Sequence, residues 1–410
     1  MRATTRNITG EQTQNAWGHA DLELRFDEYV ATKTEHVSKT TPTMVCRPKQ
    51  HIAFLKVHKC ASSTIGSVIQ KFGIEHDLVF GLPKQDTGHV GWPEPIVPDH
   101  VYFYNEAAAA GLKIEMIVHH SVFNLTTFET IMPNDTVFVT ILREPFEQFA
   151  SGINFFGAAQ FLELPRNSDR VETFLRQPER YEREVPFWFG HHHLAGKKSI
   201  TRNMMATDLG YPDDKFHDTE FALEYNDFLS KTFLVVMIKE NIHESLVVLR
   251  RRLCWKLKNI LFRRLNKRYS EDEIGYSEYS DRIHGSHKNW SSVDYLLYGH
   301  FKRKLEQEIE DGGIDLMDEV THFISVNDKF NSFCEGLGRT STDAKLSTDR
   351  YLARQSMLVP ATKWNNNFEM TAGDCLQLSK MPWEITWSQR RRFDQRLRER
   401  QRIFESRKKS

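Results

Sequence analysis

The sequence is short of cysteine and of long apolar runs. Five cysteines in 410 residues are too few and too widely spaced for a disulfide-stapled miniature or a zinc module, and their odd number leaves at least one unpaired. No window approaches the ~20 apolar residues that a membrane-spanning helix needs, and the N-terminus lacks the apolar core of a signal peptide. The chain as written therefore works in the cytosol, or an N-terminal anchor lies upstream of Met1. The cysteines are Cys46, Cys60, Cys254, Cys334 and Cys375.

The sequence also lacks an excess of charge of either sign. Lys plus Arg and Asp plus Glu number 55 each, so no overall field favours nucleic acid, and any anion must be bound by a local cluster. With 40% hydrophobic and 12% aromatic residues, the chain can bury one large core or two modest ones. The composition therefore predicts a globular protein.

Three regions differ in composition. Residues 1–48 are polar, rich in threonine and without periodicity, which predicts a stem or disordered arm. The catalytic or binding core is predicted over 49–340, and 341–410 form an extension whose basic tail favours a solvated helix or a loose arm, with a membrane or partner role as the alternative. Four Asn-x-Ser/Thr triplets would suit a secretory-pathway protein. They begin at Asn7, Asn124, Asn134 and Asn289.

Apolar runs and helical spacing alternate through the first part of the core. A strand at His51–Val57 is followed by a helix from Ser62 to Phe72, for which Gly73 is a natural stop. A further helix follows Pro145, and the alternation predicts a parallel α/β sheet. The other early strands are expected at Leu78–Phe80, Ile114–Val118 and Val137–Leu142.

The pattern from Val185 to Arg264 is mostly helical, apart from one buried strand at Phe233–Ile238. Asn241 is a candidate N-cap for the helix that follows this strand. A last helix is expected from Trp290 to Asp311, ending at Gly312 and Gly313. The apolar stripe of the helix after Asn241 comprises Leu246, Leu249, Leu253 and Leu257.

The stretch "FLKVHKCASST" at 54–64 sets two lysines and a histidine between an apolar run and small hydroxyl residues. A strand, a tight basic turn and a helix N-terminus together form an anion site, because backbone N–H groups and the helix dipole both favour a phosphate there. We call His58–Thr64 the basic turn. It contains no glycine, unlike the ATP-binding loop G-x-x-x-x-G-K-[ST], so a kinase or ATPase is disfavoured.

A second anion-binding element follows the strand Val137–Leu142. Arg143 comes directly after the strand, Pro145 opens a helix, and Ser151 lies about two turns along it. The two side chains converge on one anion only if the strand end folds over that face of the helix. The alternative is a surface arginine and an ordinary helical serine.

The two elements together resemble the sulfotransferases that use 3′-phosphoadenosine 5′-phosphosulfate (PAPS). In that superfamily a strand-loop-helix like the basic turn binds the 5′-phosphosulfate, and an Arg-x₇-Ser pair like Arg143 and Ser151 binds the 3′-phosphate. The resemblance implies a P-loop-like sulfotransferase fold, with a central, mainly parallel sheet flanked by helices and a helical C-terminal part. It also implies the donor-binding residues. These are Lys56, Lys59, Cys60, Ala61, Ser62, Ser63, Thr64, Arg143 and Ser151.

Within the superfamily the chain is most similar to the galactose-3-O-sulfotransferases, over roughly residues 48–340. "FLKVHKCASST" resembles their FLKTHKTxSST signature, and "TRNMMATDLGY", "ESLVVLRRRLCW" and "LLYGHF" resemble further family segments. The chain departs from the family at Cys60, where Thr is usual, and at Glu144, where Asp is common. It also shows no anchor.

The resemblance implies transfer of a sulfuryl group from PAPS to a sugar hydroxyl by in-line displacement. Lys59 would stabilise the leaving oxygen, and a histidine would take the proton from the acceptor. His58, beside Lys59, and His120, at the end of the run Ile114–Val118, are equal candidates for that base. No metal is required, and His119 and the run His191–His193 are read as packing or polar helix-face residues.

The implied acceptor is the 3-hydroxyl of a terminal galactose, on galactosylceramide or a related glycolipid. The alternatives are galactose on glycoprotein glycans, a uronic acid or another glycan hydroxyl, and, outside this class, a non-catalytic nucleotide-binding protein. The resemblance further implies a single-pass type II Golgi membrane protein, its anchor upstream of Met1 and its catalytic domain in the lumen. No nucleic-acid partner is expected.

Overall fold

The computed structural model describes residues 46–84, 88–155, 162–165, 168–182, 185–189, 192–264, 279–338 and 354–409. The chain divides into two units, Met1–Val45 and Cys46–Ser410, and everything described below belongs to the second. The predicted arm over 1–48 lies outside the described residues except for its last three positions, as does 341–353 of the predicted extension. Those domain boundaries stay predictions.

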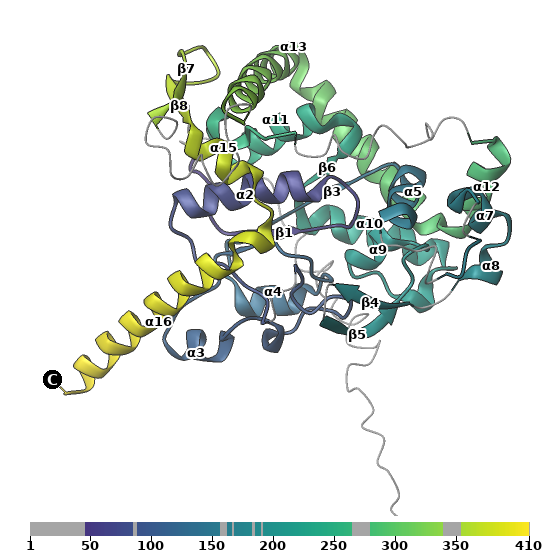
Figure 1. The fold of residues 1–410 in the computed structure, drawn as a ribbon, viewed down its shortest axis with the longest axis horizontal. Coiled ribbons are helices and arrows are strands. Elements are labelled where there is room, and N and C mark those ends of the chain that lie inside the picture. Colours follow the sequence, from purple (N-terminus) through teal and green to yellow (C-terminus); the bar gives the residue numbers. More distant parts are fainter. Residues whose placement is uncertain are drawn as a thin grey trace, which may run out of the picture. The chain divides into compact units, whose positions relative to one another are not determined.

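A four-stranded, wholly parallel sheet forms the centre of the unit, in the order β2-β1-β3-β6 (Figure 1). All four residues of β1 are at most 1% exposed, as expected for a parallel strand covered on both faces. Burying each large side chain of such a strand contributes about 1.5–3 kcal/mol. The predicted α/β class is confirmed. The strands are β1 (Ile52–Leu55), β2 (Met116–Ile117), β3 (Val137–Leu142) and β6 (Phe233–Ile238).

Three helices follow strands of the sheet in the chain. They are α2 (Ser62–Glu75) after β1, α5 (Pro145–Phe155) after β3, and α11 (Ile242–Leu253) after β6. Because β1 and β3 are paired in parallel, from Ile52 with Val137 to Leu55 with Thr140, their carboxyl ends lie side by side. The segments that follow these two strands are therefore neighbours in space, although they are some eighty residues apart in sequence.

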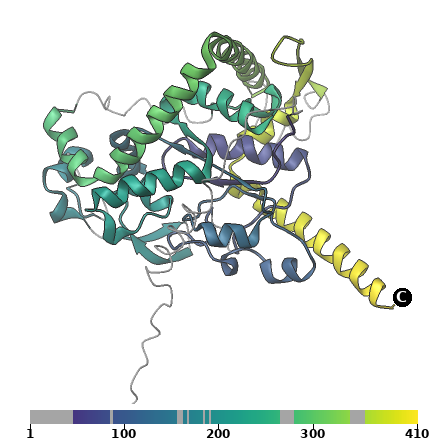
Figure 2. The ribbon, with the colours of Figure 1, turned by 180° about the vertical axis from the view of Figure 1, so that it is seen from behind.

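The C-terminal part is mainly helical, as predicted. The long helix α13 packs against α10 and α11, and both views of the ribbon show it beside α11 (Figures 1 and 2). Gly313 has a non-helical backbone within α13. The other helices are α3 (Tyr104–Ala109), α4 (Leu125–Ile131), α7 (Arg170–Arg176), α8 (Pro178–Tyr181), α9 (Met204–Asp208), α10 (Thr219–Thr232), α12 (Asp281–Trp290), α13 (Ser292–Gly338), α15 (Ala372–Ser379) and α16 (Thr386–Lys409).

The region from Val185 to Arg264 is mostly helical, as predicted, but its beginning is not. It opens with an antiparallel hairpin of β4 (Val185–Phe189) and β5 (His192–Lys198). The predicted polar helix face at His191–His193 is therefore also wrong, since His192 and His193 lie on a strand and His191 is outside the described residues. A second hairpin, β7 (Ser356–Val359) with β8 (Phe368–Thr371), packs near α13.

Several predicted boundaries also move. The helix α2 continues through Gly73, where a Cβ atom would lie 2.5 Å from the sulfur of Met116 and 2.6 Å from Phe80. Close packing against β2, and not helix termination, is thus the reason for that glycine. The predicted strand at Leu78–Phe80 forms only an isolated bridge between Phe80 and Met116.

Asn241 is the N-cap of α11, as predicted, but its side chain makes no capping hydrogen bond. Leu257 lies beyond α11, in a short 3₁₀ helix (Leu257–Ile260), although it is buried with the rest of the predicted stripe. The helix expected to start at Trp290 starts at Ser292. Its predicted end at Gly312 and Gly313 is confirmed as a break, because Gly313 has a non-helical backbone (φ 55°, ψ −152°) and a second helical segment follows it to Gly338.

Four cysteines form two disulfides, Cys46–Cys254 and Cys334–Cys375, and Cys60 is free and buried. The expectation of at least one unpaired cysteine is confirmed. Across the described ranges between 46 and 409, no helix is long and apolar enough to cross a bilayer.

Candidate active site

The basic turn joins the carboxyl end of β1 to the N-terminus of α2. Lys59 and Ala61 have φ near +60°, a left-handed conformation that is uncommon for side-chain-bearing residues and that occurs where a backbone must turn tightly. Ser62 fixes the turn by donating from Oγ to the carbonyl of Val57 (2.5 Å). Ala61, the N-cap of α2, has no side chain that could cap the first amides of the helix.

Cys60 occupies the position where the resembled family usually has threonine. Its Sγ donates to the carbonyl of His58 (3.3 Å), a contact that a hydroxyl could also make. Burial is the main reason why the pKa of the Cys60 thiol lies well above its usual value. The thiol therefore stays protonated and can donate. The departure from the family pattern therefore preserves the local hydrogen bonding of the turn.

Arg143 lies beside the basic turn, as the pairing of β1 with β3 requires. Its Nη1 donates to the carbonyl of Lys59 (3.3 Å), while Nε and Nη2 donate to Glu147 Oε2 (3.2 and 3.1 Å). Burial alone would raise the pKa of Glu147, but Lys239 and Arg143 outweigh it and the pKa is lowered. Arg143 is thus a charged group beside the basic turn, and an anion that binds there must compete with Glu147 for its N–H donors.

Ser151 lies on α5, partly buried, one helical turn beyond Glu147. Since residues four apart share one face of a helix, Ser151 continues the line from Arg143 through Glu147. The geometry that the Arg-x₇-Ser pattern needs is therefore compatible with this helix, and the hydrogen bonds described for Arg143 go to Lys59 and Glu147.

Lys59 and Lys56 have contrasting surroundings. The Lys59 ammonium lies 3.5 Å from the centre of the Phe155 ring, which is 55% exposed, so this cation is at the border with solvent. Lys56, three residues earlier, is only 2% exposed. Burial lowers its pKa to about 7.

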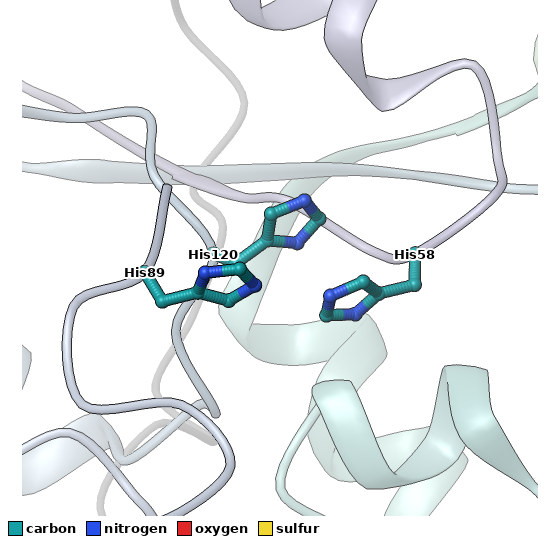
Figure 3. Close-up of side chains that lie close together, drawn as sticks. All are labelled: His58, His89 and His120. Carbon is teal, nitrogen blue, oxygen red and sulfur yellow. The ribbon is translucent and has the colours of Figure 1, made fainter. Parts of the chain in front are cut away.

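Three histidines form a layered cluster next to the basic turn, shown in Figure 3: His58, His89 and His120. We call this cluster the histidine stack. The rings of His58 and His120 are nearly parallel with centres 3.8 Å apart, and the His89 ring is 5.1 Å from that of His120. Backbone bonds align the two segments that carry His89 and His120, since Val90 donates to His120 and His120 donates to Gly88 (2.7 and 3.0 Å).

Two members of the histidine stack, His89 and His120, are held in their neutral form. Burial, followed by His58 and Lys56, keeps the pKa of His120 well below its usual value, and burial with the same neighbours does so for His89. His120 Nδ1 donates to the carbonyl of Lys56 (2.7 Å), which leaves the lone pair of this ring on Nε2. A neutral imidazole is the form that can accept a proton.

His58 has a carboxylate partner. Its Nδ1 lies 2.8 and 3.0 Å from the two oxygens of Asp208, and its backbone N–H donates to the same carboxylate at 2.7 Å. Trp92 Nε1 also donates to Asp208 (2.7 Å). His58 is 3% exposed and Asp208 is 1% exposed, so this arrangement is closed to solvent.

Asp208, His89 and Trp92 were not among the residues predicted from sequence. Asp208 lies in "TRNMMATDLGY", which was recognised only as a family segment, and that segment was the one signal that could have found it. The predicted packing role of His119 is in keeping with its position, because it is 1% exposed and its Nε2 lies 3.2 Å from Thr386 Oγ1 of α16.

Within the described residues, the histidine stack is also the one group close enough to suggest a metal. One nitrogen from each ring lies within 4.8 Å of the others. The ring planes are inclined by only 13–20°, however, and histidine lone pairs lie in the ring plane. They do not converge on one point, as the ligands of a tetrahedral metal must.

Comparison with known proteins gives one consistent result. Residues 12–357 match the family model described as galactose-3-O-sulfotransferase. The chain is 29% identical to human galactosylceramide sulfotransferase over 291 residues, which cover 70% of this chain and 65% of that protein. It is 30% identical to human galactose-3-O-sulfotransferase 2, over 63% of this chain and 61% of the relative, and to mouse galactose-3-O-sulfotransferase 3, over 64% and 58%.

The chain spans slightly less than two thirds of the length of these curated relatives, between 58% and 65%. No solved structure matches it.

Proposed function

Because the chain belongs to the galactose-3-O-sulfotransferase family, we propose that it transfers a sulfuryl group from PAPS to the 3-hydroxyl of a terminal galactose. The observation that carries the proposal is that two cationic elements and a histidine paired with a carboxylate lie together at the basic turn. Lys59 and the α2 N-terminus supply positive charge, Arg143 is bonded to the Lys59 carbonyl, and His58 faces a carboxylate. An anionic donor and a proton-yielding acceptor need this combination.

The residues divide the binding of the donor between them. The amides of Ala61 to Thr64 and the Lys59 ammonium would bind the 5′-phosphosulfate, and Arg143 with Ser151 would bind the 3′-phosphate. Lys56 would contribute a second cation once the donor's charge favours its protonated form. PAPS would supply the activated sulfuryl group, and no metal has a role in this scheme.

The transfer step is a single displacement. The galactose 3-oxygen forms a bond to sulfur as the bond from sulfur to the bridging phosphate oxygen breaks, and 3′,5′-ADP leaves. Lys59 stabilises the negative charge that develops on the bridging oxygen. The acceptor's proton passes to a neutral histidine, which becomes an imidazolium.

We assign the base to His58 and an orienting role to His120. Both rings have a donor Nδ1, so both present Nε2 as the accepting atom. Only His58 has a carboxylate behind it, and a carboxylate stabilises the imidazolium that proton transfer produces. His120 lies 3.8 Å above that ring, bonded to a neutral carbonyl that offers less stabilisation.

We propose a glycolipid acceptor, galactosylceramide or a relative of it, with glycoprotein galactose as the alternative. The glycolipid acceptor is supported by the similarity to human galactosylceramide sulfotransferase. Because the chain is equally similar to human galactose-3-O-sulfotransferase 2, glycoprotein galactose is kept as the alternative. A ³⁵S-transfer assay with galactosylceramide, lactosylceramide and N-acetyllactosamine side by side tests both. Transfer to the lipids alone supports the proposal, preference for N-acetyllactosamine supports the alternative, and transfer to none of them refutes the function.

We further propose that the unit works in the Golgi lumen, as part of a single-pass type II membrane protein. Two disulfides suit an oxidising compartment. Asn134 is exposed and could carry a glycan, whereas the Asn124 side chain already accepts from Thr127 as the cap of α4. Expression of the full gene product in animal cells should show a glycosidase-sensitive shift that Asn134→Gln reduces; a protein without glycans and with reduced cysteines would contradict luminal placement.

A further inference from the structure

We infer that Asp208 is a positioning residue for the base, acting through His58 and not on the substrate. The inference rests on the proposed function, since it needs His58 to accept the acceptor's proton. It adds a residue that the basic turn does not contain and that lies 150 positions further along the chain.

Asp208 binds both the backbone and the ring of His58. The backbone N–H of His58 donates to Oδ2 at 2.7 Å, and Nδ1 lies 2.8 Å from the same oxygen and 3.0 Å from Oδ1. A carboxylate can only accept, so the Nδ1 atom carries the proton and the lone pair is on Nε2. One side chain thus fixes the main chain of the turn, the orientation of the ring and the tautomer.

The carboxylate is itself held in place. Trp92 Nε1 donates to Oδ1 at 2.7 Å, and the Trp92 ring lies 4.6 Å from the ring of His58. Asp208 ends α9, whose first amides, those of Met205 and Ala206, donate to the buried carboxylate of Asp294 (3.2 and 2.8 Å). The short helix therefore cannot turn Asp208 away without breaking bonds at both of its ends.

The charge of Asp208 has a further effect. The ionisable groups near His58 include the other two members of the histidine stack, Lys56, Lys59 and Asp208. Positive charge on a protonated His58 would be repelled by Lys56 in its charged form. Among these groups, Asp208 is the one whose negative charge stabilises it. Removing that charge should make the imidazolium harder to form, in the ground state and in the transition state.

The test compares Asp208→Asn with wild type in the ³⁵S-transfer assay. The amide keeps the shape of the carboxylate but removes its charge, and one of its two ends presents N–H₂ instead of an acceptor to the donors of His58 and Trp92. Asparagine in place of the orienting aspartate of a serine-protease triad costs about 10⁴-fold. We expect a smaller fall in kcat here, about 100-fold, because the amide oxygen can still accept from Nδ1, with donor KM and 3′,5′-ADP affinity within about threefold. The acid limb of the kcat/KM profile should move to lower pH, which a merely structural defect would not cause.

Two control variants separate positioning from general damage. Asp374→Asn changes another largely buried aspartate, whose carboxylate accepts from the N-cap Thr371 of α15 and pairs with Lys71, and should leave the pH profile unmoved. Trp92→Phe removes one hydrogen bond to Asp208 but leaves the hydrogen bonds between Asp208 and His58. This variant should lower kcat less than about tenfold. An Asp208→Asn enzyme with more than a third of wild-type kcat and an unshifted profile would overturn the inference.

A measurement on the wild-type protein keeps the inference testable if Asp208→Asn does not fold. ¹⁵N NMR of the histidine side chains should show His58 protonated at Nδ1, and protonation at Nε2 would overturn the role of Asp208. This outcome is separate from the proposed function. A protein that shows the predicted tautomer but transfers sulfate to no galactose acceptor would refute the function alone.

Discussion

The two sides of the candidate site differ in what surrounds them. On the cationic side, Lys59 lies against an exposed phenylalanine and Arg143 shares its charge with Glu147. On the other side, the histidine stack is closed in by Trp92 and by the buried carboxylate of Asp208. One turn supplies both sides, because His58 and Lys59 are consecutive residues.

This difference indicates how a short turn can provide opposite chemistries. The Lys59 ammonium lies near solvent and the Arg143 guanidinium is paired with Glu147, and positive charge is what an anionic donor needs. Burial instead favours neutral His89 and His120, and a proton acceptor has to be neutral. The surroundings of each side thus favour charge on one side and neutral rings on the other.

The largest effect should come from the closed side. His58→Ala removes the proposed base, and general-base catalysis typically contributes 10²–10⁴-fold, so we expect kcat to fall about 10³-fold and the pH dependence of its acid limb to disappear. His120→Ala should lower the rate by a smaller factor at every pH. Full pH–rate profiles of both variants, with exposed His76→Ala as a control, make the comparison. If His120→Ala loses the acid limb and His58→Ala keeps it, the two roles are exchanged.

On the cationic side, Lys59→Ala should lower kcat by about 10²-fold, the usual range for removing a charge that acts on the leaving group. The protein should remain folded, because the ammonium packs against an exposed ring and not in the core. Transfer rates and thermal unfolding should be measured together, with the exposed Lys84→Ala as the matched control. Retention of more than about a tenth of the activity would remove Lys59 from the mechanism.

Arg143→Ala and Ser151→Ala should weaken donor binding while affecting the acceptor little. A charge-assisted bond to phosphate is worth about 1.5–3 kcal/mol. Because Arg143 already pairs with Glu147, we expect the lower end, about tenfold in the Kd of 3′,5′-ADP, and about fivefold for the neutral Ser151. Titration calorimetry measures both, with Arg176→Ala on the surface of α7 as the control. Unchanged affinity in both variants would place the 3′-phosphate elsewhere.

The smallest effect concerns Lys56, at the border between the two sides. With a pKa of about 7, this buried lysine is mostly neutral at pH 8 in the free protein. A bound 5′-phosphate favours the charged form, so 3′,5′-ADP binding should take up a fraction of a proton, and affinity should fall a fewfold as pH rises from 7 to 9.

Calorimetry in two buffers of different ionisation enthalpy measures that uptake. Lys56→Met should abolish it, whereas Lys71→Met, which removes a buried lysine already paired with Glu75 and Asp374, should not. Equal proton uptake by wild type and Lys56→Met would show that Lys56 does not meet the donor.

The parallel sheet could be predicted from the sequence because its strands are continuous apolar runs. Val137–Leu142 and Phe233–Ile238 match β3 and β6 residue for residue. The hairpin at Val185–Lys198 was missed because a helical pattern was extended over a long window. Its first strand, VPFWF, is a short apolar and aromatic run that could have been read as a strand, whereas the second, HHLAGKK, has no apolar alternation. Gly73 was misread because local pattern does not show that Met116 packs against it.

The candidate site could be predicted only where it is local in sequence. The basic turn and the Arg143–Ser151 spacing are short motifs whose chemistry can be read directly. Asp208 meets His58 across 150 residues, and Trp92 reaches both from a third segment. Such contacts depend on how loops cross the carboxyl edge of the sheet, and no periodicity records that.

The disulfide Cys46–Cys254 has a mechanical consequence. It joins the first described residue of the unit to the end of α11, and Lys49 reinforces the junction through backbone bonds to Leu253 and from the Trp255 indole (2.9 and 3.0 Å). Tension applied to the chain before Cys46 therefore passes through the covalent bridge into α11, and little of it reaches β1. A tether at that end could pull on the protein without deforming the turn that holds His58 and Lys59.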